Sequence, residues 1–231
     1  MNSRLILLLA LLPAIASAQA PAPPAATPAA PPPVLPQPAT IRVALMTSEG
    51  PIVIAVETER APITAANFLR YVDGKRLDNT EFYRTSKVAP NFGFIQGGLR
   101  NDPKKLLPPI AHEPTTKSGL THADGTISMA RNAPGSATMD FFITLGAIPS
   151  MDADPKLPGD NQGFAAFGRV VEGMETVRRI LDAQTSPTEG EGVMRGQMLA
   201  APVKILTARR APPTPAAAIP PQPAPAPPAR P

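Results

Sequence analysis

The side chains that most often carry out metal-dependent or nucleophilic chemistry are scarce in this chain of 231 residues. It has no cysteine and only two histidines, His112 and His122. The sequence His112-Glu113-Pro114 is not followed by a second histidine at the spacing that zinc proteases use. Residues 152–156 begin like a calcium loop, but Lys156 occupies a ligand position and no glutamate closes the loop. Because phosphate-cradling, dinucleotide-binding and nucleophile-elbow motifs are also missing, we expect a function without a metal ion, a nucleophile or a cofactor.

Several short motifs carry more information, because they occur together. They are FYR at 82–84, FIQGG at 94–98, GTISMAR at 125–131, FFI at 141–143 and FGRVVEGM at 167–174, preceded by the stretch from Ala61-Pro62 to Asn67-Phe68. In this order the motifs closely resemble those of the cyclophilin family of peptidyl-prolyl cis-trans isomerases. The likeness covers nearly all of residues 41–207. Each motif is weak by itself, but their combination is a strong signal.

The resemblance implies both a fold and an active site. The fold is mainly β, a closed eight-stranded antiparallel barrel capped by two α-helices, with the active face on the outside of the barrel. Arg84 matches the family's catalytic arginine, and Gln96 matches the glutamine that orients the substrate. Four further residues match positions that line or flank the family's proline pocket, and two lie near the backbone that pairs with the substrate: Phe94, Met129, Phe142 and Met151, then Ala130 and Asn132.

These residue types suit the isomerisation of an X-Pro peptide bond. Rotation about a peptide bond has a barrier of about 18–20 kcal/mol, because the nitrogen donates its lone pair into the carbonyl. An enzyme needs only to favour the twisted state, in which the nitrogen regains that lone pair. On this interpretation Arg84 donates a hydrogen bond to the prolyl nitrogen, and Gln96 helps to hold the substrate backbone. The apolar residues form a slot for the proline ring and exclude water, which strengthens the Arg84 interaction.

The chain departs from the family pattern at three candidate substrate-binding positions. The interval 85–95 is longer than usual, which leaves either Phe92 or Gly93 at the place of the family's pocket phenylalanine. Asp140 stands where a glutamine normally precedes the paired phenylalanines, so we expect a changed contact with the substrate backbone. Phe164 lies near the position of a family histidine.

The elements that position these residues follow from the spacing of apolar side chains. Alternation predicts strands over 41–47 and 52–57, joined as a hairpin through Glu49-Gly50-Pro51. Apolar residues at helical spacing predict one helix from Pro62 to Asp73-Gly74 and another from Met174 to near Gln184. The other apolar runs are short and separated by Gly, Pro and Asn: 81–84, 94–96, 125–130, 141–145, 165–171 and 203–207. Several short antiparallel strands with few helices indicate a barrel or a sandwich.

Proline content divides the chain into one domain and two arms. Of the 33 prolines, nine lie in residues 19–40 and ten in residues 211–231, whereas residues 41–210 contain 13. The arms consist largely of Pro and Ala, which favours extended polyproline II structure and provides no core. Residues 41–210 are numerous enough to bury a sizeable core as a single domain.

Residues 1–18 have the features of an export signal. Arg4 is followed by an apolar stretch and then by Ala16-Ser17-Ala18, whose small residues fit a signal peptidase. We therefore expect cleavage after Ala18 and export to a bacterial periplasm, with secretion as the alternative. No apolar run reaches the length of a membrane helix, so we expect no stable membrane insertion. The long, uncharged arm favours a monomer.

Charge and aromatic content argue against a nucleic-acid partner. The formal net charge is +4, tryptophan is absent, only two tyrosines occur, and no run of Lys or Arg exceeds a pair. The expected partners are proline-containing polypeptides. We thus expect a peptidyl-prolyl cis-trans isomerase that assists the folding of exported proteins. The alternative is a non-catalytic binding module, a holdase or tether that captures proline-containing chains without isomerising them.

Overall fold

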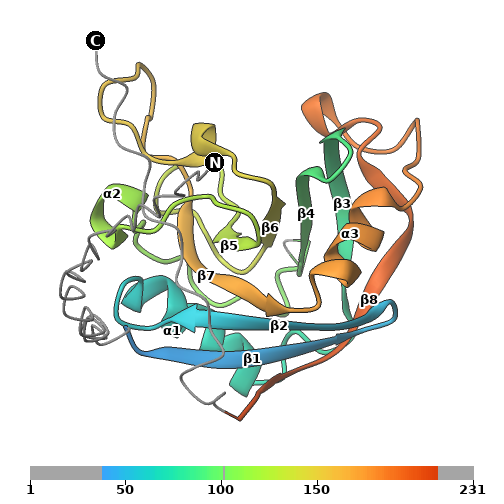
Figure 1. The fold of residues 1–231 in the computed structure, drawn as a ribbon, viewed down its shortest axis with the longest axis horizontal. Helices are drawn as coiled ribbons and strands as arrows, with labels where there is room; N and C mark the ends of the chain where they lie inside the picture. The colour runs from blue at the N-terminus through green and yellow to red at the C-terminus, as the bar shows by residue number, and fades with distance from the viewer. Residues whose placement is uncertain (1–37, 101, 213–231) are drawn as a thin grey trace, which may run out of the picture. The chain divides into compact units, whose positions relative to one another are not determined.

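A closed barrel of antiparallel strands forms the folded domain (Figure 1). The computed structural model describes residues 38–100 and 102–212, so the expected leader and almost all of both proline-rich arms lie outside the described residues. The strands are β1 (Thr40–Thr47), β2 (Gly50–Glu57), β3 (Thr80–Ala89), β4 (Phe92–Gly98), β5 (Thr126–Met129), β6 (Phe141–Leu145), β7 (Ala165–Glu172) and β8 (Met198–Arg210). They close in the order β1-β2-β7-β5-β6-β4-β3-β8, and β8 pairs with β1. The expected eight-stranded barrel is confirmed.

Three α-helices and two 3-10 turns accompany the strands in the described ranges. The helices are α1 (Pro62–Asp73), α2 (Thr115–Ser118) and α3 (Met174–Asp182), and the turns are η1 (Pro149–Met151) and η2 (Gly192–Met194). The two expected helices are confirmed as α1 and α3, which both pack on the barrel. The single turn α2 was not predicted, because four residues are too few to show a helical spacing of apolar side chains. None of the helices in residues 38–100 and 102–212 is long and apolar enough to cross a membrane.

The long interval 85–95 forms a hairpin rather than an open loop. β3 and β4 pair along it, and Pro90 and Asn91 make the turn. Asn91 has a φ of 55°, a left-handed conformation that asparagine tolerates better than most residues. The additional residues therefore extend two strands and leave the barrel order unchanged.

Aromatic side chains fill part of the barrel interior. The ring centroids of Phe68 and Phe141 are 6.0 Å apart, those of Phe68 and Phe167 are 5.2 Å apart, and those of Phe82 and Phe141 are 5.7 Å apart. Consecutive residues of a strand point to opposite faces. Because Phe141 points into this core, the next residue of β6, Phe142, is directed to the outside of the barrel.

A buried carboxylate fixes the start of α1. The Glu113 side chain accepts hydrogen bonds from the backbone N–H groups of Ile63 (3.1 Å) and Thr64 (2.6 Å) and from the Thr64 hydroxyl (2.7 Å). The first N–H groups of a helix have no partner within the helix, and a negative charge stabilises them. Glu113, which follows His112 in the chain, therefore serves as the cap of this helix.

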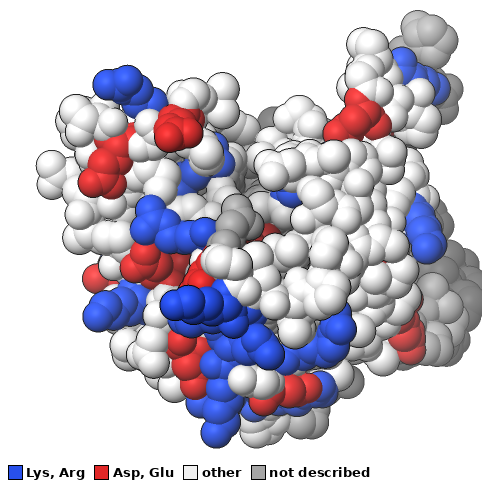
Figure 2. Space-filling model, turned by 180° about the vertical axis from the view of Figure 1, so that it is seen from behind, with Lys and Arg blue, Asp and Glu red and all other residues white. Residues whose placement is uncertain are grey.

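Ion pairs connect the end of β8 to the region around the end of α1. Arg209 pairs with Asp78 and Arg210 pairs with Asp73, each at an N–O distance of 2.7 Å. The side-chain hydrogen bonds from the arginines lower the pKa of both aspartates. Figure 2 shows acidic side chains interspersed among the basic ones in the lower part of its face. These pairs fasten the last strand of the barrel to the helical segment beside it.

Candidate active site

Three side chains from neighbouring strands form a row across the outside of the barrel. Arg84 on β3 is the register partner of Gln96 on β4, and Gln96 is the partner of Phe142 on β6. Neighbouring strands lie about 4.8 Å apart, so side chains at paired positions on one face can touch. The barrel therefore brings the expected arginine, the expected glutamine and an expected pocket residue together.

A β-bulge gives Arg84 its direction. The register between β3 and β4 shifts between Phe82 and Arg84, so Tyr83 is an additional residue in β3. Phe82 stays in the core, whereas Tyr83 and Arg84 both face the outer cavity. Strict alternation would have turned Arg84 to the same side as Phe82. Bulges commonly re-aim side chains in this way beside active sites.

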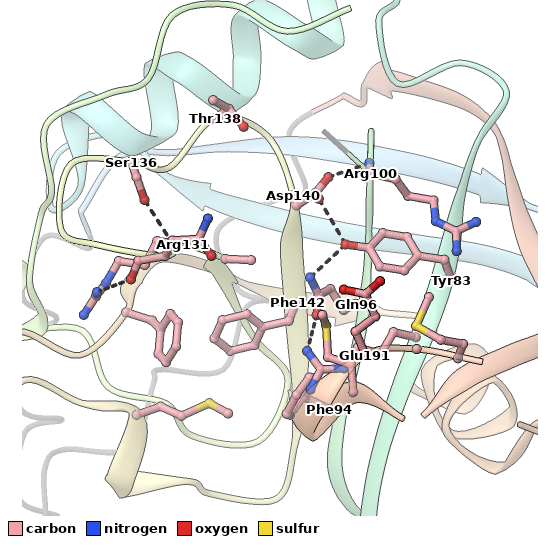
Figure 3. Close-up of a pocket in the computed structure, with 18 of the residues that line it drawn as sticks. Tyr83, Phe94, Gln96, Arg100, Arg131, Ser136, Thr138, Asp140, Phe142 and Glu191 are labelled. Atoms are coloured by element: carbon pink, nitrogen blue, oxygen red, sulfur yellow. Dashed lines mark hydrogen bonds between the residues drawn. The ribbon is translucent and has the colours of Figure 1, made fainter. Parts of the chain in front are cut away.

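The row borders a cavity of about 810 Å³ (Figure 3). Nine of the eleven expected site residues line it: Arg84, Phe94, Gln96, Ala130, Asn132, Asp140, Phe142, Met151 and Phe164. The rest of the lining comes from Tyr83, Arg100, Arg131, Ser136 and Thr138, and from Glu189, Gly190, Glu191, Met194 and Met198 before and at the start of β8. The cavity is thus shared by segments that are far apart in the sequence.

Two of the expected residues lie elsewhere. Met129 is 0% exposed in the barrel core, because it shares the inward face of β5 with Ile127. Phe92 stands at the start of β4 beside the hairpin turn, where its ring lies against Gly146. Phe94 comes two residues later on the same face of β4 and lines the cavity. In the lengthened hairpin, the aromatic residue of the cavity is therefore Phe94, and neither Phe92 nor Gly93 lines it.

The apolar part of the cavity is built around Phe142. Its ring centroid lies 5.5 Å from that of Phe94 and 5.3 Å from that of Phe164, which meets it edge to face. The imidazole of His122 stacks on the same ring at 5.8 Å and an interplanar angle of 14°. Three aromatic neighbours therefore hold Phe142, which is only 3% exposed, as a rigid apolar wall.

His122 is itself held in place by two polar side chains. Its Nδ1 atom lies 2.6 Å from the carboxylate of Asp152, and its Nε2 atom lies 3.0 Å from the hydroxyl of Ser128. The backbone N–H of His122 also donates to Asp152 at 2.9 Å. The sequence did not predict this contact, because the two partners of His122 come from separate segments that only the fold brings together.

The loop after Asp152 is fastened to the cavity wall by Arg131. The guanidinium donates to both carboxylate oxygens of Asp160, at 2.7 and 2.9 Å, and lies 5.3 Å from the ring centroid of Phe164. Its Nε also donates to the Gly163 carbonyl at 2.8 Å. The hydrogen bonds from Arg131 lower the pKa of Asp160 to about 2, so this pair persists in mildly acidic solution. The loop thereby holds Phe164 beside Phe142.

A series of hydrogen bonds crosses the polar part of the cavity. Arg84 Nη1 donates to Gln96 Oε1 at 2.8 Å, Gln96 Nε2 donates to the Tyr83 hydroxyl at 2.8 Å, and this hydroxyl donates to Asp140 at 3.0 Å (Figure 3). Arg84 also donates through Nε (3.0 Å) and Nη2 (2.7 Å) to Gln197 Oε1. Burial lowers the pKa of Arg84, but an arginine starts so far above neutrality that the guanidinium stays charged.

Tyr83 and Gln197 were not among the expected site residues. Tyr83 stands directly before Arg84, but its role depends on the bulge, which the sequence does not show. Gln197 lies 113 residues beyond Arg84 in a segment without a recognisable motif. Only the closure of β3 against β8 brings Gln197 to the arginine.

Comparisons with known proteins agree with this geometry. The family model described as "Cyclophilin type peptidyl-prolyl cis-trans isomerase/CLD" matches residues 42–209. The chain is 35% identical over 156 residues to peptidyl-prolyl cis-trans isomerase A of Dickeya dadantii, covering 66% of this chain and 77% of that protein. It is 34% identical over 174 residues to a peptidyl-prolyl cis-trans isomerase of Acinetobacter baylyi, covering 74% and 86%. A crystal structure of a cyclophilin-type isomerase from Cryptosporidium parvum matches with a TM-score of 0.59 and 19% identity over 76% of this chain and 100% of that one, a likeness of fold.

Proposed function

This chain belongs to the cyclophilin-type peptidyl-prolyl cis-trans isomerases, and we propose that the Arg84 cavity is the site at which it isomerises X-Pro bonds of exported proteins. The observation that carries this proposal is a charged guanidinium fixed beside an aromatic wall, with Gln96 between them. This arrangement offers both of the things the reaction requires, a hydrogen-bond donor for the prolyl nitrogen and an apolar surface for the proline ring.

The remaining donors of Arg84 provide the interaction with the twisted amide. An arginine carries five N–H donors, and the contacts with Gln96 and Gln197 use three of them. Within the described residues, two N–H groups are left for a bound substrate. The prolyl nitrogen accepts a hydrogen bond only after conjugation with the carbonyl is lost, so this contact forms in the transition state and not in the ground state.

The apolar wall makes that contact stronger. Phe142 and Phe94 line the cavity with aromatic carbon against which the proline ring can pack, and Met151 adds a flexible apolar side chain. A proline ring against these residues displaces water from the cavity. The hydrogen bond from Arg84 then forms in a medium of lower dielectric constant, where it contributes more to lowering the barrier.

The experiment that tests the proposal is a proline-limited assay. The protein starting at Gln19 is added in substoichiometric amounts to a refolding protein whose slow phase is X-Pro isomerisation, or to a protease-coupled peptide assay. We expect the slow phase to accelerate in proportion to the amount added. Peptide binding with no acceleration over buffer would instead favour the non-catalytic holdase or tether.

Export to the periplasm is the second part of the proposal, and the pattern of residues 1–18 supports it. We expect the mature protein to appear in the periplasmic fraction of an expressing bacterium. Intact-mass spectrometry of that fraction should show that the protein begins at Gln19. The change Ala18→Glu places a large charged residue at the cleavage site and should leave an unprocessed precursor. A cytoplasmic protein that retains Met1 would contradict this part without affecting the activity assay.

A further inference from the structure

We propose that Gln197 and the pair Tyr83–Asp140 are positioning residues that fix the guanidinium of Arg84 for isomerisation. The inference rests on the proposed function, and it deepens that function by assigning a role to three residues that touch no reacting atom. Its basis is the continuous series of hydrogen bonds that runs from Asp140 through Tyr83 and Gln96 to Arg84 and ends at Gln197.

Asp140 sets the direction of this series. One carboxylate oxygen accepts the backbone N–H groups of Leu99 (2.7 Å) and Arg100 (3.0 Å), and the other accepts the hydroxyl of Tyr83 (3.0 Å). An ionised carboxylate can only accept, so the Tyr83 proton must point to Asp140. The Tyr83 oxygen is then left as an acceptor toward the cavity. Both carboxylate oxygens of Asp140 thus accept hydrogen bonds from the protein itself. This is the position at which the sequence predicted a changed contact with the substrate backbone.

The direction of the Tyr83 hydroxyl decides how Gln96 is turned. The amide nitrogen of Gln96 donates to the Tyr83 oxygen, and the amide oxygen therefore faces Arg84. With the amide reversed, its N–H groups would face the N–H groups of the guanidinium, and neither side would have an acceptor. Burial raises the pKa of Tyr83, which keeps its proton in place. The carboxylate of Asp140 thereby fixes the orientation of Gln96, and through Gln96 the position of the Arg84 guanidinium.

Gln197 holds the other side of the guanidinium. One amide oxygen receives both Nε and Nη2 of Arg84, and the ring of Phe94 lies 5.1 Å from the guanidinium carbon. The Gln197 backbone is anchored as well, because its carbonyl accepts the N–H of Thr85 at 2.9 Å. The amide is neutral, so it restrains Arg84 without cancelling its charge. A carboxylate at this place would form an ion pair and weaken the field at the prolyl nitrogen.

A glycine, Gly98, lets the backbone at the end of β4 pass close to Asp140. Gly98 has a φ of 136°, and a Cβ atom there would lie 2.4 Å from the Asp140 carboxylate and 2.8 Å from its Cα. Only glycine fits both the conformation and the space. The cation that acts on Asp140 is Arg100, whose guanidinium lies 4.9 Å from the Tyr83 ring centroid and pairs with Glu81.

The test compares matched pairs of variants in the proline-limited assay. Gln197→Met keeps the length of the side chain but removes the acceptor, and we expect kcat to fall about tenfold with little change in KM, since the Arg84 guanidinium that Gln197 positions acts only in the transition state. Gln197→Glu restores an acceptor and should recover part of kcat. The control is Gln184→Met, which makes the same substitution at an exposed glutamine earlier in the chain.

A second pair uses the two tyrosines of the chain. Tyr83→Phe breaks the series between Asp140 and Gln96, and it should lower kcat several-fold. Tyr71→Phe also removes a buried hydroxyl, one that accepts the Leu107 N–H at 2.7 Å, and should leave kcat unchanged at a similar cost in stability. The thermal midpoint of each variant separates loss of fold from loss of positioning.

The side chain of Arg84 gives a readout that does not depend on turnover. In the nuclear magnetic resonance spectrum its Nε–H should exchange slowly with solvent in the wild type and rapidly in Gln197→Met. An inactive wild type would refute the proposed function. An active wild type with full kcat in both Gln197→Met and Tyr83→Phe would refute the positioning role alone.

Discussion

Replacement of Arg84 by alanine is expected to lower kcat/KM for an X-Pro peptide by about a hundredfold, the usual loss when one preorganised transition-state donor is removed. Peptide affinity should change little, because the apolar wall around Phe142 remains. A protease-coupled assay gives kcat/KM, and titration with a fluorescent peptide gives the dissociation constant. The combination of retained binding and lost turnover is the signature of a group that acts only on the twisted amide.

Two variants make the Arg84 result specific. Arg84→Lys keeps the positive charge but loses the planar guanidinium that hydrogen-bonds to Gln96 and Gln197 at the same time. It should therefore show only a little more activity than Arg84→Ala. Arg178→Ala removes an exposed arginine from α3 and should behave as the wild type. If Arg84→Ala retained turnover within about threefold of the wild type, a difference of roughly 0.7 kcal/mol in barrier, Arg84 would have no part in the reaction.

Replacement of Phe142 by alanine is expected to affect binding and stability together. The ring packs on Phe94, Phe164 and His122, and its removal opens a gap that these neighbours can fill only in part. Loss of a buried phenylalanine costs about 3 kcal/mol in unfolding free energy. We also expect KM to rise at least tenfold, because the proline ring loses its principal apolar contact. Urea unfolding measures the first effect, and the dependence of the protease-coupled rate on peptide concentration measures the second.

A matched pair on β6 separates the two effects. Phe142→Leu and Phe141→Leu each replace a buried ring by a smaller apolar side chain, with comparable costs in stability. Phe141 faces Phe68 and Phe82 inside the barrel, whereas Phe142 faces the cavity. Only Phe142→Leu should therefore raise KM. Equal KM values for the two variants would remove Phe142 from the substrate-binding surface.

Local sequence patterns predicted the elements that bury only one of their faces in the core. α1 and α3 begin at Pro62 and Met174, as the helical spacing of apolar residues indicated, because each helix buries one stripe against the barrel. Strand ends were less predictable. β8 begins at Met198 rather than near Val203. Its exposed residues belong to the strand because β8 pairs with β3, and not because apolar and polar side chains alternate along it. Closure of the strands into a barrel rather than a sandwich came from the family resemblance, and the order of the strands in the barrel was not predicted.

The site shows the same division. The types and order of Arg84, Gln96 and Phe142 are properties of the sequence, and they were sufficient to indicate the chemistry. Met129 was expected beside the pocket, but the inward face of β5 takes it into the core. A shift of one residue along a strand moves a side chain to the opposite face, so a motif match alone cannot assign the face.

The sequence by itself determined which groups this protein has for the reaction, a guanidinium, an amide and aromatic rings, because residue identity fixes charge, donors and apolar surface. Only the tertiary structure decided how these groups are held. The bulge at Tyr83 turns Arg84 outward, and Gln197 reaches it from 113 residues away. Hydrogen bonds depend on distance and direction in space, and for partners so far apart in the chain both are set by closure of the barrel.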